Sequence, residues 1–134
     1  MPDTFIIIGG GASGVLVAVQ LLRHASEPCT IILIEPSADL GRGIAYNSHN
    51  PLYLLNVRAD NMSAFPDNPS HFLNWARQRS NGVGVTAESF LPRCWYADYL
   101  QAILKEAIAR AQPGVVLEWR QATVIGMTPW TNQM

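Results

Sequence analysis

Three glycines with a fixed spacing stand near the start of the chain, directly after an apolar run. They are Gly9, Gly11 and Gly14, and the run before them is Phe5 to Ile8. A glycine turn of this kind brings a diphosphate close to the free backbone N–H groups at the start of the next helix, where the helix dipole also favours negative charge. The spacing therefore predicts a dinucleotide-binding turn.

Each glycine of the turn has its own steric role. Gly9 allows the chain to leave the strand sharply, Gly11 lets the backbone approach the phosphate oxygens, and Gly14 lets the helix pack closely on the sheet. Ala12 and Ser13 lie between the last two glycines. We predict that all five residues contact the cofactor.

A carboxylate at the end of the next apolar run completes the pattern. Glu35 follows the run 31–34, comes twenty-one residues after Gly14, and is itself followed by Pro36. A carboxylate in this place can accept hydrogen bonds from the ribose hydroxyls of adenosine, and it would repel a 2′-phosphate. We therefore assign Glu35 and Pro36 to the predicted site. The alternative is a glycine-rich turn in some other kind of α/β protein.

The elements that must position these residues form a βαβ unit. The hydropathy pattern predicts strands over residues 4–8 and 30–34, with a helix over 12–24 between them. This helix is apolar on nearly every face, so we expect it to be deeply buried. The second strand lacks polar alternation, which is typical of a parallel strand covered on both faces.

The rest of the chain predicts two more helices and two more β runs. One helix is expected over 68–79, with Asn68 as N-cap, Pro69 in the first turn and Asn81-Gly82 as the stop. Apolar residues at three- and four-residue spacing predict another helix over 95–111, and β runs cover 115–119 and 122–127. Residues 36–66 are a long irregular stretch, which indicates a functional loop.

These elements predict an α/β fold of the Rossmann type. Right-handed crossovers favour a parallel sheet in the order 3-2-1, with helices on its faces in a three-layer arrangement. The long loop and the helix over 68–79 are inserted after the second strand. The predicted diphosphate site lies at the carboxyl ends of the strands.

Composition narrows the possible partners. The 134 residues suit one domain, 14% of them are charged, and the net charge is −1. No basic stripe suggests a nucleic acid, and no polybasic run suggests a membrane surface. Phe5 to Leu22 carries no charge, but glycines interrupt it and no basic residue precedes it. We therefore expect neither a signal peptide nor a membrane span, and we expect a cytoplasmic protein.

The cysteines and histidines show no spacing typical of a metal site. Cys29 and Cys94 form no C-x-x-C motif, so two reduced thiols are expected, with a redox pair or a nucleophile as the alternative. His24, His49 and His71 are scattered, and we expect them at ordinary polar positions. No nucleophile, histidine and acid form a catalytic set, so we predict neither catalytic side chains nor a metal.

Several segments together resemble one known family. They read I-I-G-G-G-A-S-G at 7–14, E-P at 35–36, G-R-G-I-A-Y at 41–46, L-L-N-V-R-A-D-N-M-S-A-F-P at 54–66 and F-L-P-R-C-W-Y-A-D-Y-L at 90–100. In these segments the chain is similar to the FAD/NAD(P)-binding proteins of the NAD-binding 9 type. Those proteins are related in fold to glutathione reductase and to flavin monooxygenases.

The resemblance implies FAD as the cofactor, with NAD as the alternative. It also implies that the glycine turn faces the diphosphate and that Glu35 faces the adenosine ribose. Arg42 resembles a basic residue that lies beside the adenine or the diphosphate, although a solvated loop arginine is the alternative.

Two more positions gain a possible role from the resemblance. Asn56, with its neighbours Leu55 and Val57, would lie toward the flavin ring, unless it is an ordinary turn residue. Arg93 would contact phosphate, or would pair with a loop carboxylate, which we favour.

The resemblance further implies the FAD-binding N-terminal portion of a flavin-dependent oxidoreductase, of the monooxygenase type. Family members are several times longer, so we expect residues 1–134 to form one domain that is incomplete at its C-terminus and too short to be active alone. A missing C-terminal domain or self-association would then cover its open surface. The alternatives are a non-catalytic module that binds NAD or an adenine nucleotide, and an inactive fragment that associates with a partner through its sheet edge.

Overall fold

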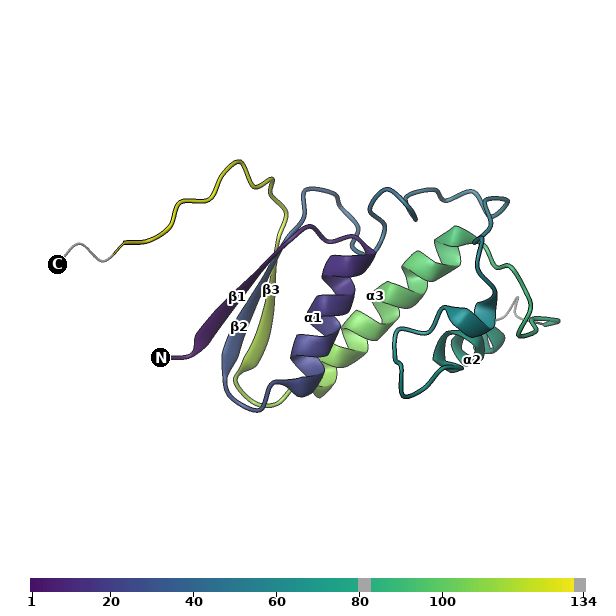
Figure 1. Cartoon of the computed structure of the whole chain (residues 1–134), viewed down its shortest axis with the longest axis horizontal. Coiled ribbons are helices and arrows are strands. Elements are labelled where there is room, and N and C mark those ends of the chain that lie inside the picture. Colours follow the sequence, from purple (N-terminus) through teal and green to yellow (C-terminus); the bar gives the residue numbers. More distant parts are fainter. Residues whose placement is uncertain (80–82, 132–134) are drawn as a thin grey trace.

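A computed structural model describes residues 1–79 and 83–131 of the chain (Figure 1). Its elements follow the order expected of a βαβ unit with a long insertion. They are β1 (Asp3–Ile8), α1 (Ala12–His24), β2 (Cys29–Ile34), the 3-10 turn η1 (Ala59–Asn61), α2 (His71–Gln78), α3 (Arg93–Arg110) and β3 (Val115–Arg120).

The three strands form one parallel sheet in the order β1-β2-β3, which confirms the predicted order 3-2-1 read from the other edge. Asp3 pairs with Cys29, and Cys29 pairs with Val115, so the three strands are in step from their first residues. Backbone bonds continue past the strand ends, with Gly9 N–H donating to the Ile34 carbonyl at 2.8 Å. The glycine turn and the end of β2 are therefore held side by side at the carboxyl ends of the strands.

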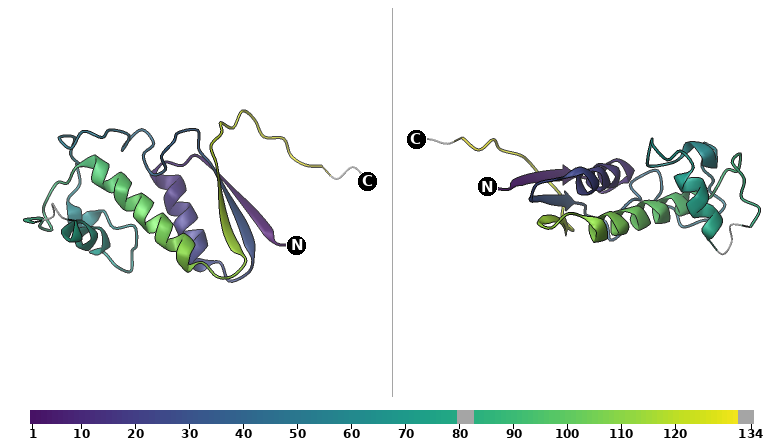
Figure 2. Two further views of the ribbon diagram at one scale, coloured as in Figure 1. Left: turned by 180° about the vertical axis from the view of Figure 1, so that it is seen from behind. Right: turned by 90° about the horizontal axis from the view of Figure 1, so that it is seen from below.

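Both long helices lie on one side of the sheet, side by side (Figures 1 and 2). The side chains of β2 alternate between buried and half-buried, and Ile31 and Leu33 are fully buried. The expected third layer is therefore not formed by the described residues, which make a sheet and one helical layer. For the same reason β2 has one fully buried face rather than two.

The surface of α1 shows the same arrangement. Val15, Ala18, Val19 and Leu22 are buried, but Val17 is 50% exposed. The prediction of deep burial all round α1 was wrong, because sheet and α3 cover only part of its circumference.

The later elements differ from the prediction at their ends. The helix α2 begins at His71, after Ser70 in the N-cap position, rather than after Asn68. The predicted stop at 81–82 lies outside the described residues. The helix α3 begins at Arg93, two residues early, because Pro92 at its N-cap has a φ of −57° that already suits a helix start.

The predicted β run over 122–127 was wrong. These residues form no strand with any part of the chain that the structure describes, and Ile125 and Met127 are 99% and 87% exposed. β-Branched residues favour a strand only where a neighbouring strand supplies hydrogen bonds and a surface to pack on.

An aromatic cluster fixes the long segment between β2 and α3. Tyr96 and Tyr99 of α3 pack against Phe72 and Trp75 of α2, with ring centroids 4.9 to 5.4 Å apart in the Tyr99–Phe72, Tyr96–Phe72 and Tyr99–Trp75 pairs. The loop adds Tyr46, whose ring centroid lies 5.0 Å from that of Tyr96. The irregular segment is therefore anchored by packing rather than by regular structure.

Across residues 1–79 and 83–131, no helix has both the length and the apolar character needed to cross a lipid bilayer.

Candidate dinucleotide-binding site

The glycine turn has the shape that its sequence predicts. Gly9 has a φ of +98°, a left-handed conformation that glycine adopts without strain. A Cβ on Gly14 would overlap the carbonyl oxygen of Gly9 and would stand 3.0 Å from its carbonyl carbon. The first turn of α1 therefore packs against the backbone of the turn with no room for a side chain.

No side chain of the described residues caps the N-terminus of α1. Gly11 is its N-cap, and no described side chain accepts a hydrogen bond from the first turn. The Gly11 carbonyl accepts from Val15 N–H at 3.0 Å, so the helix is regular from its start. The N–H groups of the first turn have no intrahelical partners. They carry the positive end of the helix dipole into the space in front of α1.

The segment 41–46 forms a second wall opposite the glycine turn. Gly41 N–H donates to the Gly10 carbonyl at 2.7 Å, and the Cα of Gly43 lies 3.3 Å from where a Cβ on Gly11 would stand. Gly41 and Gly43 have φ values of +82° and +54°. This wall therefore depends on its own glycines as well as on those of the turn.

A cavity of about 320 Å³ lies between the two walls. It brings together six of the predicted site residues and five that sequence reasoning did not assign to the site, four of them in the wall over 41–46. The predicted ones are Gly9, Gly11, Ala12, Ser13, Gly14 and Arg42; the others are Gly43, Ile44, Ala45 and Tyr46, and Ile8 completes the lining. The G-R-G-I-A-Y segment was noticed in the sequence as part of the resemblance. Most of its residues line the cavity without a polar side chain, so residue type alone did not assign them to the site.

Glu35 is held at the mouth of the turn by hydrogen bonds to its carboxylate. One oxygen accepts from Gly10 N–H at 2.9 Å, and the other accepts from the Ser37 N–H at 2.9 Å and from the Ser37 hydroxyl at 2.6 Å. The bonds from Ser37, its hydroxyl first, lower the pKa of Glu35, against a small opposing effect of burial. The carboxylate is thus ionised and fixed in direction, with lone pairs left for further donors.

Two residues beside Glu35 were missed by the sequence analysis. A Cβ on Gly10 would stand 2.7 Å from Leu40 Cδ2 and 2.8 Å from Glu35 Cβ, so this position also requires glycine. Ser37 supplies two of the three bonds to the carboxylate. Serine often forms local hydrogen bonds of this kind with a neighbouring residue, so its place two residues after Glu35 could have indicated this contact.

Pro36 continues the turn at the sheet edge and is exposed. Its carbonyl accepts from Gln121 Nε2 at 3.3 Å, while the Glu35 carbonyl accepts from Trp119 Nε1 at 3.4 Å. The end of β3 therefore supports the backbone on both sides of the Glu35 side chain. Pro36 does not line the cavity.

Arg42 is not a solvated loop arginine. Its side chain is 13% exposed, and its guanidinium bonds Asp39 at 3.2 Å and approaches Asp98 at 3.9 Å. It also donates to the Tyr46 carbonyl at 3.4 Å. Arg42 lines the cavity while fixing the wall that contains it. Asp39 pairs closely with the guanidinium, and Asp98 is shared with Arg79 at 3.1 Å. The charge of Arg42 is therefore partly balanced and attracts a diphosphate less than a free guanidinium would.

Arg93 ties two segments of the resemblance together. Its guanidinium donates to the carbonyls of Leu54 at 3.0 Å and Ala45 at 3.3 Å, and its backbone N–H donates to the Tyr53 carbonyl at 2.8 Å. The favoured pairing with a loop carboxylate was wrong, because these bonds run to backbone oxygens, and the contact with phosphate stays a prediction.

Asn56 lies apart from the cavity. It is exposed, whereas Leu55 beside it is buried and donates its N–H to the Leu91 carbonyl at 2.8 Å. The structure does not bring Asn56 to the glycine turn, so its place beside a flavin ring stays a prediction.

The described residues contain no group of three or more histidines, cysteines, aspartates or glutamates that could hold a metal ion. Cys29 is buried and Cys94 is half-buried, and both are free thiols.

A parallel sheet whose glycine turn meets an uncapped helix N-terminus defines a dinucleotide-binding protein of the Rossmann type. The chain belongs to the FAD-NAD(P)-binding family, whose family model matches residues 6–134. The match includes the glycine turn, Glu35 and the wall over 41–46. A dinucleotide cofactor is therefore supported by the family as well as by the geometry. A comparison with curated proteins found no match for the chain.

Proposed function

We propose that this chain is the FAD-binding portion of a flavin-dependent oxidoreductase, of the monooxygenase type. One observation carries the proposal. The uncapped N-terminus of α1 opens into a cavity of about 320 Å³ between the glycine turn and the wall over 41–46. The ionised Glu35 does not line this cavity, but its carboxylate is fixed to the same turn by the bond from Gly10 N–H. A negative diphosphate fits the first feature, and a sugar with free hydroxyls fits the second.

In this proposal each part of the chain has a separate task. The backbone amides of the first turn of α1 hold the diphosphate, and Glu35 orients the adenosine ribose. Arg42 keeps the opposite wall in place through its bonds to Asp39 and Asp98. FAD would supply the redox chemistry, and the protein would bind it, orient it and exclude water around it.

The choice of FAD rests on the family resemblance, and NAD is the alternative. The described residues contain no metal cluster, and the cavity lining includes none of the three histidines. This lining also suits a non-catalytic module that holds NAD or an adenine nucleotide. Glu35 disfavours NADP in both cases, because its carboxylate would face the 2′-phosphate.

Calorimetry with FAD, NAD and NADP tests the proposal. We expect FAD to bind most tightly and NADP most weakly, and we expect the purified complex with FAD to be yellow. Tighter binding of NAD than of FAD would favour the non-catalytic module, and no binding of any dinucleotide would refute the site.

The variant Gly11→Val tests whether the dinucleotide binds at the glycine turn. Its side chain would stand where the diphosphate meets the backbone, and its Cβ would lie 3.3 Å from the Gly43 Cα. We expect a loss of affinity of about tenfold or more, which is about 1.4 kcal/mol or more. The control is Gly126→Val, since a Cβ there meets nothing within 4 Å.

A further inference from the structure

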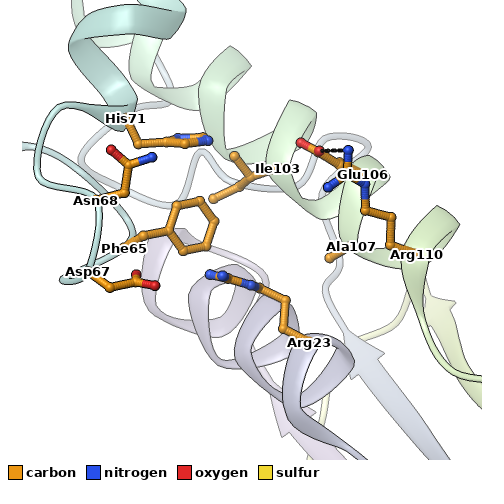
Figure 3. Close-up of a pocket in the computed structure, with 9 residues that line it drawn as sticks. All are labelled: Arg23, Phe65, Asp67, Asn68, His71, Ile103, Glu106, Ala107 and Arg110. Carbon is orange, nitrogen blue, oxygen red and sulfur yellow. Dashed lines mark ion pairs between the residues drawn. The ribbon is translucent and has the colours of Figure 1, made fainter.

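A second cavity, of about 210 Å³, lies at the opposite end of α1 from the glycine turn. It is bounded by the last turn of α1, the loop before α2 and one face of α3 (Figure 3). None of its lining residues lines the dinucleotide cavity. Arg23 is twelve residues along α1 from Gly11, or about 18 Å at 1.5 Å per residue, so the two cavities are separate sites.

The floor of this cavity is apolar and well packed. Phe65, Ile103 and Ala107 line it, and they are 8%, 4% and 6% exposed. The guanidinium of Arg23 lies over the Phe65 ring, 4.1 Å from its centroid. The His71 ring meets Phe65 edge-on, with the centroids 4.7 Å apart. The floor therefore offers a surface for a small apolar group, with polar atoms around it.

His71 forms part of the wall as a neutral ring. Its Nδ1 lies 2.8 Å from the Tyr99 hydroxyl, and that hydroxyl accepts from the Ala64 N–H at 3.1 Å. Burial lowers the pKa of His71, with a smaller opposing effect of the Glu106 charge and a small effect of Arg23 in the same direction as burial. Because Nδ1 is already bonded, Nε2 is the ring nitrogen left for a ligand.

Four charged side chains surround the floor, two of each sign. Arg23 and Asp67 lie at one side of the cavity, and Glu106 and Arg110 form an ion pair of 3.0 Å at the other (Figure 3). Among the described residues, neither Arg23 nor Asp67 has an ion-pair partner within 4.0 Å. The Glu106–Arg110 pair is an exposed pair one helical turn apart, a kind that contributes little and exchanges readily.

This balance of charges selects the class of ligand. A simple anion would meet the carboxylates of Asp67 and Glu106, and a simple cation would meet the two guanidinium groups. A dipolar molecule with both charges avoids either conflict. The volume lies below the 300 to 1,000 Å³ or so of ordinary ligand pockets, so the molecule must be small.

We propose that this cavity binds a free amino acid with an apolar side chain. Its carboxylate would pair with Arg23 and its ammonium group with Glu106, while its side chain would lie on Phe65 and Ile103. His71 Nε2 and the Asn68 amide would complete the polar contacts. The proposal does not depend on which dinucleotide the first site binds, or on whether it binds one.

The proposal is tested by titrating the whole chain with L-leucine while the NMR signals of the His71 ring are recorded. We expect a saturable shift of these signals. The methyl ester of leucine lacks the carboxylate and N-acetyl-leucine lacks the ammonium group, so we expect each to bind about tenfold more weakly or worse. Equal binding of all three compounds would overturn the dipolar assignment, and no saturable shift with leucine would overturn the site.

Two variants locate the ligand. Arg23→Gln should weaken leucine binding by about tenfold or more. Lys105→Gln removes the same charge from an exposed position of α3 that does not line the cavity, and it should bind like the parent. Equal affinity of Arg23→Gln and the parent would overturn the assigned contact. Gly11→Val should keep leucine binding intact, so failure of the dinucleotide site and failure of this one are distinguishable.

Discussion

Gly14→Ala is the sharpest test of how the glycine turn is built. The added methyl group would overlap the Gly9 carbonyl oxygen and stand 3.0 Å from the carbonyl carbon. Both atoms belong to the backbone, and Gly9 is itself held by its N–H bond to the Ile34 carbonyl. No side chain can turn aside to make room, so the start of α1 must move away from the sheet.

The expected cost follows from this overlap. Overpacking of a well-packed region costs about 1 to 3 kcal/mol. A chain of this length loses roughly 4 °C in melting temperature for each kcal/mol, so we expect a decrease of roughly 4 to 12 °C. Dinucleotide affinity should also fall, because the shifted helix carries its N–H groups away from the diphosphate.

Thermal unfolding followed by circular dichroism measures the first effect, and calorimetry with FAD measures the second. Gly126→Ala is the control, because a Cβ at that glycine meets nothing within 4 Å. If Gly14→Ala melted and bound FAD like the parent and the control, the close contact between α1 and the turn would be refuted.

Three further predictions concern titration and specificity. Ser37→Ala removes the hydroxyl bond that is the largest cause of the lowered pKa of Glu35, so carboxyl NMR should show that pKa rise toward 4.5, and an unchanged pKa would contradict the assigned cause. Glu35→Gln should weaken FAD binding and reduce the preference for NAD over NADP in calorimetry; an unchanged preference would place the ribose elsewhere. Because the pKa of His71 is lowered below its ordinary 6.5, the unfolded chain binds more protons near and below that pH, so the free energy of unfolding should fall as pH decreases through 6.5. His71→Gln should flatten this part of the pH dependence in urea titrations, and an equal slope in both proteins would contradict it.

The βαβ unit could be predicted from the sequence almost to the residue, because its signals are local. The glycine spacing, the apolar runs and the acid after β2 lie within the first thirty-five residues. The helix α1 begins and ends where the pattern placed it. Sheet order also followed, since the handedness of crossovers leaves few arrangements.

Features that depend on distant contacts could not be predicted in this way. The wall over 41–46 is held by a backbone bond from Gly41 to Gly10 and by a bond from the Arg93 guanidinium to the Ala45 carbonyl, and no residue-type pattern predicts such bonds. His71 was expected at an ordinary polar position, but it packs in the aromatic cluster, because α3 brings Tyr99 to it from twenty-eight residues away. Residues 122–127 have the composition of a strand, but no described strand lies beside them to pair with.

One guanidinium joins parts of the chain that are far apart in sequence. Arg93 holds the carbonyl of Ala45, forty-eight positions earlier, as well as that of Leu54. Closing a loop of this length costs conformational entropy before the long-range contacts form, and contacts distant in sequence form slowly. We therefore expect the wall over 41–46 to form only after α3 has packed in place. A shortened chain that ended before Arg93 would keep the glycine turn in its sequence, but it would lose the guanidinium that holds the wall over 41–46 on the other side of the cavity.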